Sequence, residues 1–188
     1  MSSPTTPTSC SRNAPTISTA GWPASWPTRA RSACDKGGGI VELLRFRRFH
    51  ETDLPVYAAW FEDAELARRA PFPDAEWLAD ATTGDGVVAE VASLDAEGTP
   101  VAVLRYEEEG DGGITLFVAV APAERRKGIG HRVLIAFAER AADRFSHIDI
   151  YVARDNEAAL ALARRCGFRL MAGPDEDGFV PYRLILTA

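Results

Sequence analysis

The sequence contains few cysteines, few histidines and no long apolar run, and each shortage excludes a class of protein. The three cysteines, Cys10, Cys34 and Cys166, are too few and too widely spaced for a disulfide framework or a four-thiolate zinc site. None of the three histidines stands at a metal-ligand spacing from a cysteine, so we expect no metal. No stretch approaches the roughly 20 apolar residues that a membrane-spanning helix needs.

Basic residues are also in the minority, which gives the chain a formal net charge of −6. This charge disfavours functions that depend on broad electrostatic attraction to nucleic acid. Together with the missing apolar run, it predicts a soluble, cytoplasmic protein that binds neither nucleic acid nor membrane. The length of 188 residues suits one domain, and the sequence leaves open whether the protein is a monomer or a homodimer.

Residues 1–40 differ in composition from the rest of the chain. They are rich in Ser, Thr, Pro and Gly, show no helical or strand periodicity, and end near the three glycines at 37–39. Such a segment buries too little apolar surface to offset its chain entropy, so we expect a disordered tail. Two other interpretations stay open. The segment is a transit peptide, or it results from a start site placed too far upstream, since Val41 can be encoded by the start codon GTG.

The predicted domain, residues 41–188, is more acidic than the whole chain. It holds 17 basic and 26 acidic residues, a net charge of −9. An acidic domain favours cationic small molecules or basic peptide ends over anionic partners.

The first part of this domain has the pattern of a strand followed by two helices. Apolar and β-forming residues predict a strand over residues 41–49. A continuous helix is expected next, with N-cap chemistry at Asp53, Pro55 in its first turn, and helical spacing as far as Leu66. Residues 74–81 predict a shorter helix that ends at a glycine-containing loop.

Three strand-like runs follow, over residues 86–94, 100–107 and 114–120. Short loops with glycine separate them, which is typical of antiparallel strands joined by tight turns. We therefore expect an antiparallel meander in this part of the chain.

Beyond residue 120 the pattern alternates between helix and strand. It predicts a helix over 132–145, a strand over 148–152 and a second helix through Cys166. Asp155 or Asn156 can cap this second helix, and Gly167 is expected to stop it. Residues 168–172 and 179–187 complete the sheet as an antiparallel pair. The expected fold is a mixed α/β domain with a central sheet of six to seven strands, antiparallel in its N-terminal part, with a parallel βαβ step and about four flanking helices.

Residues 125–130, Arg-Arg-Lys-Gly-Ile-Gly, place three cations and two glycines at the start of a helix. The first turn of a helix presents unpaired N–H groups and a partial positive charge. Gly128 and Gly130 would let a phosphate approach that backbone, so the loop predicts a pyrophosphate cradle. A Walker-type or dinucleotide-binding loop fits poorly, because His131 follows Gly130 and Val133 replaces a third glycine. The alternative is a basic turn that only stabilises the helix.

The same loop resembles the Arg/Gln-x-x-Gly-x-Gly/Ala motif of the GNAT superfamily of acyl-CoA-dependent N-acyltransferases, and Val120-x-Pro122 before it fits that pattern. A second motif downstream is similar to the family's Asn-x-x-Ala-x-x-Leu-Tyr-x-x-x-Gly-Phe. Its residues in this chain are Asn156, Ala159, Leu162, Gly167 and Phe168. Two motifs at matching separation, with the order of strands and helices over residues 41–188, imply a GNAT-like fold.

The resemblance implies an N-acetyltransferase that takes acetyl-CoA as its co-substrate and transfers the acetyl group directly to a primary amine in a ternary complex. The backbone of the strand before the loop would bind the pantetheine arm, and the loop would bind the pyrophosphate. The implied CoA-binding residues are Val118, Val120, Arg125, Arg126, Lys127, Gly128, Ile129, Gly130, His131 and Asn156. A backbone amide near Val118 would stabilise the oxyanion.

One catalytic position departs from the family pattern. The tyrosine that follows the motif leucine, often the acid that protonates the CoA thiolate, is Ala163 here. Tyr182 on the last strand is a candidate substitute, and Cys166 is expected to pack inside its helix.

The general base is equally open, because the predicted strand 114–120 contains no carboxylate. Glu107 and Glu108 lie on opposite faces of the preceding strand, so one of them can face the acceptor. Both can instead be solvated strand-end residues, and Glu51 is a further candidate.

Two functions from different classes therefore remain. The leading hypothesis is an N-acetyltransferase acting on a small-molecule or peptide amine: a protein N-terminus, an amino sugar or antibiotic, a polyamine or an amino acid. The alternative is a non-catalytic module that binds or senses acyl-CoA, which Ala163 and the missing strand carboxylate motivate.

Overall fold

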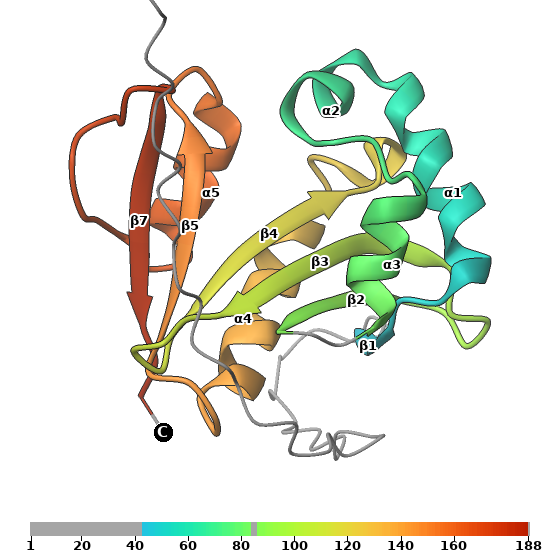
Figure 1. Ribbon diagram of the computed structural model, residues 1–188, viewed down its shortest axis with the longest axis horizontal. Helices are drawn as coiled ribbons and strands as arrows, with labels where there is room; N and C mark the ends of the chain where they lie inside the picture. Colours follow the sequence, from blue (N-terminus) through green and yellow to red (C-terminus); the bar gives the residue numbers. More distant parts are fainter. Residues whose placement is uncertain (1–42, 84–85, 188) are drawn as a thin grey trace, which may run out of the picture. The chain divides into compact units, whose positions relative to one another are not determined.

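The structure, a computed structural model, describes residues 43–83 and 86–187, which form one seven-stranded sheet (Figure 1). The strands lie in the order β1-β2-β3-β4-β5-β7-β6. The tail expected over residues 1–40 lies outside the described residues.

The first four strands form the predicted antiparallel meander. They are β1 (Arg45–Arg48), β2 (Val87–Ser93), β3 (Pro100–Glu108) and β4 (Ile114–Val120). Strands β2 to β4 match their predicted ranges closely. The turn between β3 and β4 contains Gly112 at φ +84°, a left-handed conformation that glycine adopts without steric cost.

The second half of the sheet begins with a parallel step. The chain leaves β4, crosses as α4 (Ile129–Ala141) and returns as β5 (His147–Ala153), which pairs parallel to β4. This confirms the predicted βαβ unit. The predicted start of the helix at residue 132 is wrong: α4 begins at Ile129, because Gly128 acts as its N-cap with φ +83°.

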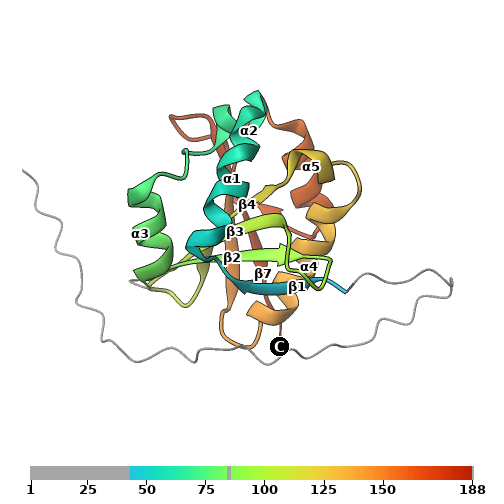
Figure 2. The same ribbon diagram turned by 90° about the vertical axis from the view of Figure 1, so that its right-hand side faces the viewer.

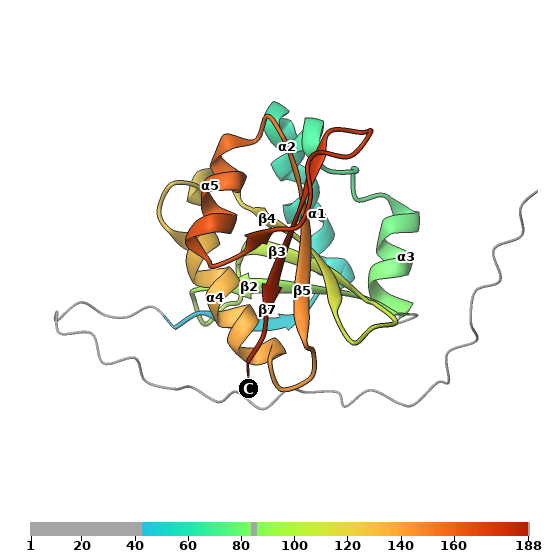
Figure 3. The same ribbon diagram turned by 90° about the vertical axis from the view of Figure 1, so that its left-hand side faces the viewer.

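The remaining elements close the sheet on the far side of β5. They are α5 (Glu157–Arg165), β6 (Arg169–Leu170) and β7 (Phe179–Ile185). Strand β7 pairs antiparallel with both β5 and β6, as expected for the final strand pair. Figures 1 and 3 show β5 and β7 running at a steep angle to β2 and β3.

The segment between β1 and β2 differs from the two helices expected there, because the first of them is broken. It contains the 3₁₀ turns η1 (Glu51–Asp53) and η2 (Trp60–Glu62) and the helices α1 (Leu54–Ala59), α2 (Ala64–Arg69) and α3 (Ala75–Thr83).

The predicted helix is interrupted at Asp63, which has extended backbone angles of φ −75° and ψ 114°. The Asp63 side chain accepts a hydrogen bond of 2.9 Å from the Leu66 N–H and so caps α2. An aspartate that bonds a nearby backbone N–H competes with a continuous helix, and this explains the break.

Helices cover both faces of the sheet (Figures 1 and 2). One buried cluster joins the sheet to α4 and α5, and a second joins it to α1, α2 and α3. Strand β3 shows how the faces alternate: Leu104 and Tyr106 belong to the α4–α5 cluster, whereas Val103 belongs to the other. We call these the α4 face and the α1 face. Each strand residue can thereby be assigned to one face.

In the part of the chain that the structure describes, no helix is both long enough and apolar enough to cross a membrane.

Candidate functional site

Strands β4 and β5 separate soon after they begin to pair. Their register joins only Ile114 to Ile148 and Thr115 to Asp149, although β4 continues to Val120 and β5 to Ala153. Beyond Thr115 the β5-facing edge of β4 therefore has no partner among the described strands. An extended molecule with amide groups can hydrogen-bond to such an edge as an added strand does.

Helix α4 begins at the open end of this separation. Its first turn exposes the N–H groups of Ile129, Gly130 and His131, which precede the first helical hydrogen bond, from the Arg132 N–H to the Gly128 carbonyl at 3.1 Å. The Ile129 side chain is buried in the α4 face cluster, so only its backbone is available to a ligand. We call residues 125–130 the α4 loop. Together with the first turn of α4 it presents three N–H groups and the positive end of the helix dipole.

The two loop glycines have different structural roles. Gly128 has φ +83°, and a Cβ atom there would meet nothing within 4 Å, so its backbone conformation is what favours glycine. At Gly130 a Cβ atom would lie 3.1 Å from Leu162 Cδ2 and 3.5 Å from Val120 Cγ2. Gly130 therefore lets α4 pack closely on α5 and β4, a role that the sequence did not reveal.

The three loop cations also differ. Arg125 Nη1 forms an ion pair of 2.8 Å with Asp63 Oδ1, and Lys127 Nζ lies 3.0 Å from Glu124 Oε1. Arg126 is exposed and forms no ion pair with any residue in the described ranges. Its backbone has φ 61°, uncommon for a residue other than glycine. Of the predicted phosphate-binding cations, Arg126 is the one whose charge is not already matched.

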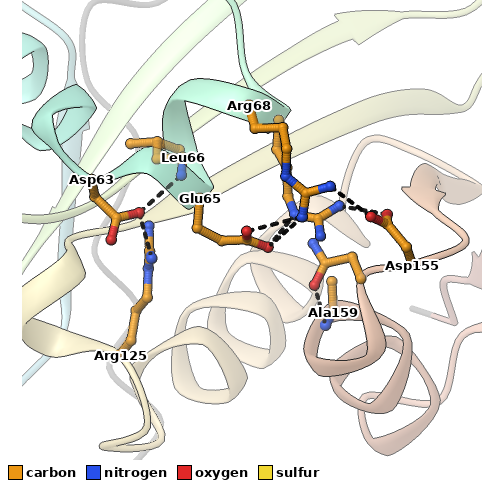
Figure 4. A network of polar contacts seen from close by, with 9 residues as sticks. Asp63, Glu65, Leu66, Arg68, Arg125, Asp155 and Ala159 are labelled. Carbon is orange, nitrogen blue, oxygen red and sulfur yellow. Dashed lines mark hydrogen bonds and ion pairs between the residues drawn. The ribbon is translucent and has the colours of Figure 1, made fainter.

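Helix α2 connects the ends of the two separating strands (Figure 4). On one side Asp63 binds Arg125, which follows β4. On the other side Arg68 and Arg69 bind Asp155, which follows β5, at 2.6 and 2.9 Å. The hydrogen bonds from Arg69 and Arg68 hold the pKa of the Asp155 carboxyl far below its ordinary range. Exposed pairs each contribute little stability, so this bridge mainly sets the position of α2.

Of the two predicted caps of α5, Asp155 and Asn156, the structure has Asn156: its Oδ1 accepts a hydrogen bond of 3.1 Å from the Ala159 N–H. Gly167, which has φ +87°, follows the C-cap Cys166 and stops the helix as predicted. The capping bond occupies the Asn156 carbonyl oxygen and leaves the side-chain NH₂ group for a ligand.

A row of polar side chains crosses the sheet where β4 and β5 separate. Strand register aligns Glu107 with Thr115, Thr115 with Asp149, and Asp149 with Arg183. The alternation places this row on the α1 face. The row places two carboxylates, Glu107 and Asp149, at the point where β4 and β5 separate.

The model of the acetyltransferase (GNAT) family matches residues 45–168. The chain belongs to this family. The match runs from β1 through α5 and ends just before β6, so it includes the α4 loop and the α5 cap.

One curated relative of this GNAT protein matches only part of the chain. Mycothiol acetyltransferase from Actinosynnema mirum is 35% identical over 85 residues, 45% of this chain. The chain covers only 25% of that relative's length.

Solved structures share the fold at low sequence identity. Spermidine N-acetyltransferase from Vibrio cholerae, in complex with CoA and spermine, has a TM-score of 0.66 at 15% identity over 76% of this chain and 95% of that one. Aminoglycoside acetyltransferase AAC(6')-Ib with coenzyme A gives 0.64 at 17% identity over 76% and 95%. The GNAT domain of S. lividans PAT gives 0.63 at 21% identity over 76% and 90%. These likenesses confirm the predicted GNAT-like fold.

The candidate bases of this GNAT chain lie in different surroundings. Glu107 is exposed on the α1 face. Glu108 lies on the α4 face, where its Oε1 is 2.9 Å from Arg144 Nη2. Glu51 follows β1 at the edge of the sheet, with β2 and β3 between that strand and β4.

The candidate acid, Tyr182, is 5% exposed and packs in the α4 face cluster with Ala163 and Cys166. Burial raises the pKa of the Cys166 thiol, which keeps it protonated. Tyr182 lies opposite Ile150 of β5, one residue beyond the last residue that β5 pairs with β4.

Asp149 and Arg183 are candidate site residues that the sequence did not reveal. Arg183 donates two hydrogen bonds to the Asp149 carboxylate, at 2.7 and 2.6 Å. The apolar residues at 148, 150 and 152 were the signal, since their alternation places residue 149 on the opposite face. Only the strand register shows that Asp149 stands where β4 and β5 separate.

Proposed function

We propose that the protein is an acetyl-CoA-dependent N-acetyltransferase that transfers an acetyl group to a primary amine by direct attack in a ternary complex. The observation that carries the proposal is the unpaired edge of β4 leading to the first turn of α4, beside the unmatched charge of Arg126. Membership of the GNAT family supports it.

In this proposal the backbone of Val118 and Val120 pairs with the amides of the pantetheine arm. Arg126 and the N–H groups of residues 129–131 bind the pyrophosphate, because a helix N-terminus with exposed amides favours anions. Asn156 donates a hydrogen bond to the pantetheine from the other side of the separation.

The transfer needs a base, a site for the oxyanion and a proton for the thiolate. Glu107 takes a proton from the attacking amine, directly or through water, because it is the predicted carboxylate on the α1 face beside the separation. A backbone N–H near Val118 stabilises the oxyanion. As the carbon–nitrogen bond forms and the carbon–sulfur bond breaks, Tyr182 or water supplies the proton to the sulfur.

The acceptor belongs to the small-molecule or peptide amines. Solved structures that share the fold include acetyltransferases with spermine or an aminoglycoside bound, which supports a small-molecule acceptor. We also propose a cytoplasmic protein, as a monomer or homodimer, without nucleic acid, membrane or metal in its function.

Release of free thiol from acetyl-CoA, measured against a panel of primary amines, tests this proposal. We expect turnover with at least one amine, and Glu107→Gln should lower kcat about a hundredfold or more while CoA affinity stays unchanged. If Glu108→Gln lowers kcat and Glu107→Gln leaves it normal, the general base is Glu108 and not Glu107. Tight CoA binding without turnover on any amine would favour the alternative, an acyl-CoA sensor, which the buried Ala163 motivates.

A further inference from the structure

Arg105 lies at the boundary between the covered and the open part of the α1 face. It occupies the middle of β3, opposite Phe117 of β4. Val103, two residues earlier in β3, is fully buried in the cluster that the sheet forms with α1, α2 and α3. Glu107, two residues later, is exposed. Arg105 itself is half-buried, one strand away from the edge where β4 leaves β5.

This arginine has no counter-charge in the described part of the chain. Its Nε atom is buried and has no hydrogen-bond partner. Five other partly buried arginines each bind a carboxylate: Arg47, Arg69, Arg125, Arg140 and Arg183. A partly buried charge without a partner costs free energy, and a bound anion would remove that cost.

Neighbouring groups do not supply the missing charge. Tyr57 of α1 interacts electrostatically with Arg105, but its ring is packed among Phe49, Trp60 and Trp77. Burial raises the pKa of Tyr57 well above its ordinary value, although the charge of Arg105 opposes that shift. The phenol therefore stays neutral. Glu107, on the same face two residues along β3, forms no ion pair with Arg105 or with any other described residue.

We propose that Arg105 binds a carboxylate carried by the acceptor, so that the substrates are amines of the amino-acid type. This inference rests on the proposed N-acetyltransferase function and names its substrate class. Alternate residues of a strand share one face and are about 7 Å apart along the backbone, so Arg105 and Glu107 place a positive and a negative side chain next to each other on the α1 face, as a small zwitterion requires. A guanidinium binds a carboxylate through two parallel hydrogen bonds, and Glu107 favours the ammonium. Polyamines, which carry only positive charge, would be poor acceptors despite the acidic domain.

Steady-state acetylation of matched acceptors tests the inference. Standard amino acids are compared pair by pair with their amino acid amides, and spermidine is included as a polyamine. For the best pair we expect the carboxylate form to have the higher kcat/KM by about ten- to a hundredfold, mainly through KM. Arg105→Gln should abolish this preference, mainly by raising KM for the carboxylate form, whereas Arg105→Lys should keep part of it.

The matched control is Arg164→Gln, which removes the same charge from an exposed position on α5, over the other face of the sheet. It should keep the preference intact. Melting temperature and CoA affinity establish whether each variant is folded. If Arg105→Gln is unfolded, the wild-type preference and its partial retention in Arg105→Lys decide whether Arg105 binds the carboxylate.

The two proposals fail in different ways. Acetylation of amides or of spermidine as efficiently as of amino acids, or a preference that survives Arg105→Gln, would overturn the role of Arg105 and leave the acetyltransferase standing. Absence of thiol release with every amine would overturn both.

Discussion

Arg126 of the α4 loop carries conformational strain, because its backbone has a left-handed φ of 61°. Gly128 has φ 83°, which a glycine adopts without steric cost. For a residue other than glycine or asparagine this conformation costs roughly 1–2 kcal/mol. Strain of this kind is common where a backbone is shaped to receive a ligand. The loop geometry therefore agrees with the proposed pyrophosphate site.

Replacement of Gly128 separates the backbone requirement from the need for a small residue. Gly128→Ala should destabilise the protein by about 1 kcal/mol and weaken CoA binding, because alanine resists a positive φ. Gly128→Asn should retain more of both, since asparagine tolerates this conformation despite its larger side chain. Thermal unfolding and calorimetric titration with CoA measure the effects, and an asparagine variant weaker than the alanine variant would contradict this explanation.

Asp53 links stability to pH. Its carboxylate, 5% exposed, accepts hydrogen bonds from Arg47 at 2.6 and 2.7 Å. Burial alone would raise the pKa of Asp53, but the Arg47 guanidinium and the His50 N–H lower it overall. The stabilisation is therefore present above the unfolded-state pKa of about 3.9 and is lost as pH falls through the lower folded-state pKa.

We expect Asp53→Asn to be about 2 kcal/mol less stable than the wild type at pH 7, with the difference shrinking as the pH falls below about 4. Urea unfolding at a series of pH values measures it. Asp80→Asn, at an exposed position on α3, is the control and should show little difference from the wild type. A constant gap between Asp53→Asn and wild type down to pH 2 would rule out the linkage.

Contacts between residues that are close in the sequence were predictable. The Asn156 cap and the Gly167 helix stop followed from their positions beside an apolar repeat. The partner of Arg125 was not predictable, because Asp63 lies 62 positions away in the sequence and only the fold brings the two together. The same limit hid the alignment of Asp149 with Thr115.

At the scale of elements, helical periodicity was right for α3, α4 and α5 and misleading between β1 and α3. Apolar residues from Tyr57 to Leu66 repeat at helical spacing, yet the chain breaks at Asp63. The signal was present in the sequence, since an aspartate can cap a new helix in the middle of such a repeat. Because of the break, the cap residue Asp63 binds Arg125 while α2 binds Asp155.

A buried ion pair joins β2 to α4. Glu90, 1% exposed, is bonded to Arg140, whose guanidinium lies 4.4 Å from the centre of the Phe46 ring and 5.3 Å from that of Phe137. Burial and the nearby Glu90 charge raise the pKa of Tyr106 to about 12. The strand and the helix are thus held by charge as well as by apolar contact.

Arg140→Met should destabilise the protein by about 3–5 kcal/mol, because it leaves the Glu90 carboxylate buried without its partner. The double variant Glu90→Met/Arg140→Met should regain most of that loss, since two apolar side chains need no counter-charge. Chemical denaturation of both variants measures the coupling. A double variant less stable than Arg140→Met would show that the pair itself contributes net stability.

For the whole molecule, the mixed α/β class was predictable from the alternation of patterns, whereas the place of β7 between β5 and β6 and the opening of the sheet were not. Period-two runs with short turns indicated the meander, and the strand–helix–strand pattern indicated the parallel step. Nothing in the periodicity of β4 or β5 tells that their pairing stops after Thr115 and Asp149. That depends on the twist of the sheet and on the packing of α4 and α5 against it.

Residues 1–40 are proposed to be dispensable for the domain. The family match begins at residue 45, which supports this view. A protein starting at Val41 should keep the melting temperature and the CoA affinity of the full chain. A fall in either quantity would show that the first forty residues contribute to the domain.

Calorimetric titration with CoA tests most directly the central claim, that the α4 loop binds the pyrophosphate. The wild type should release or absorb measurable heat with saturable binding, and Arg126→Glu should weaken binding by about tenfold or more. Arg45→Glu makes the same charge change at an exposed position on β1, an edge strand separated from β4 by β2 and β3, and should leave binding unchanged. Absence of any heat at millimolar CoA, or equal affinity in the two variants, would contradict the account.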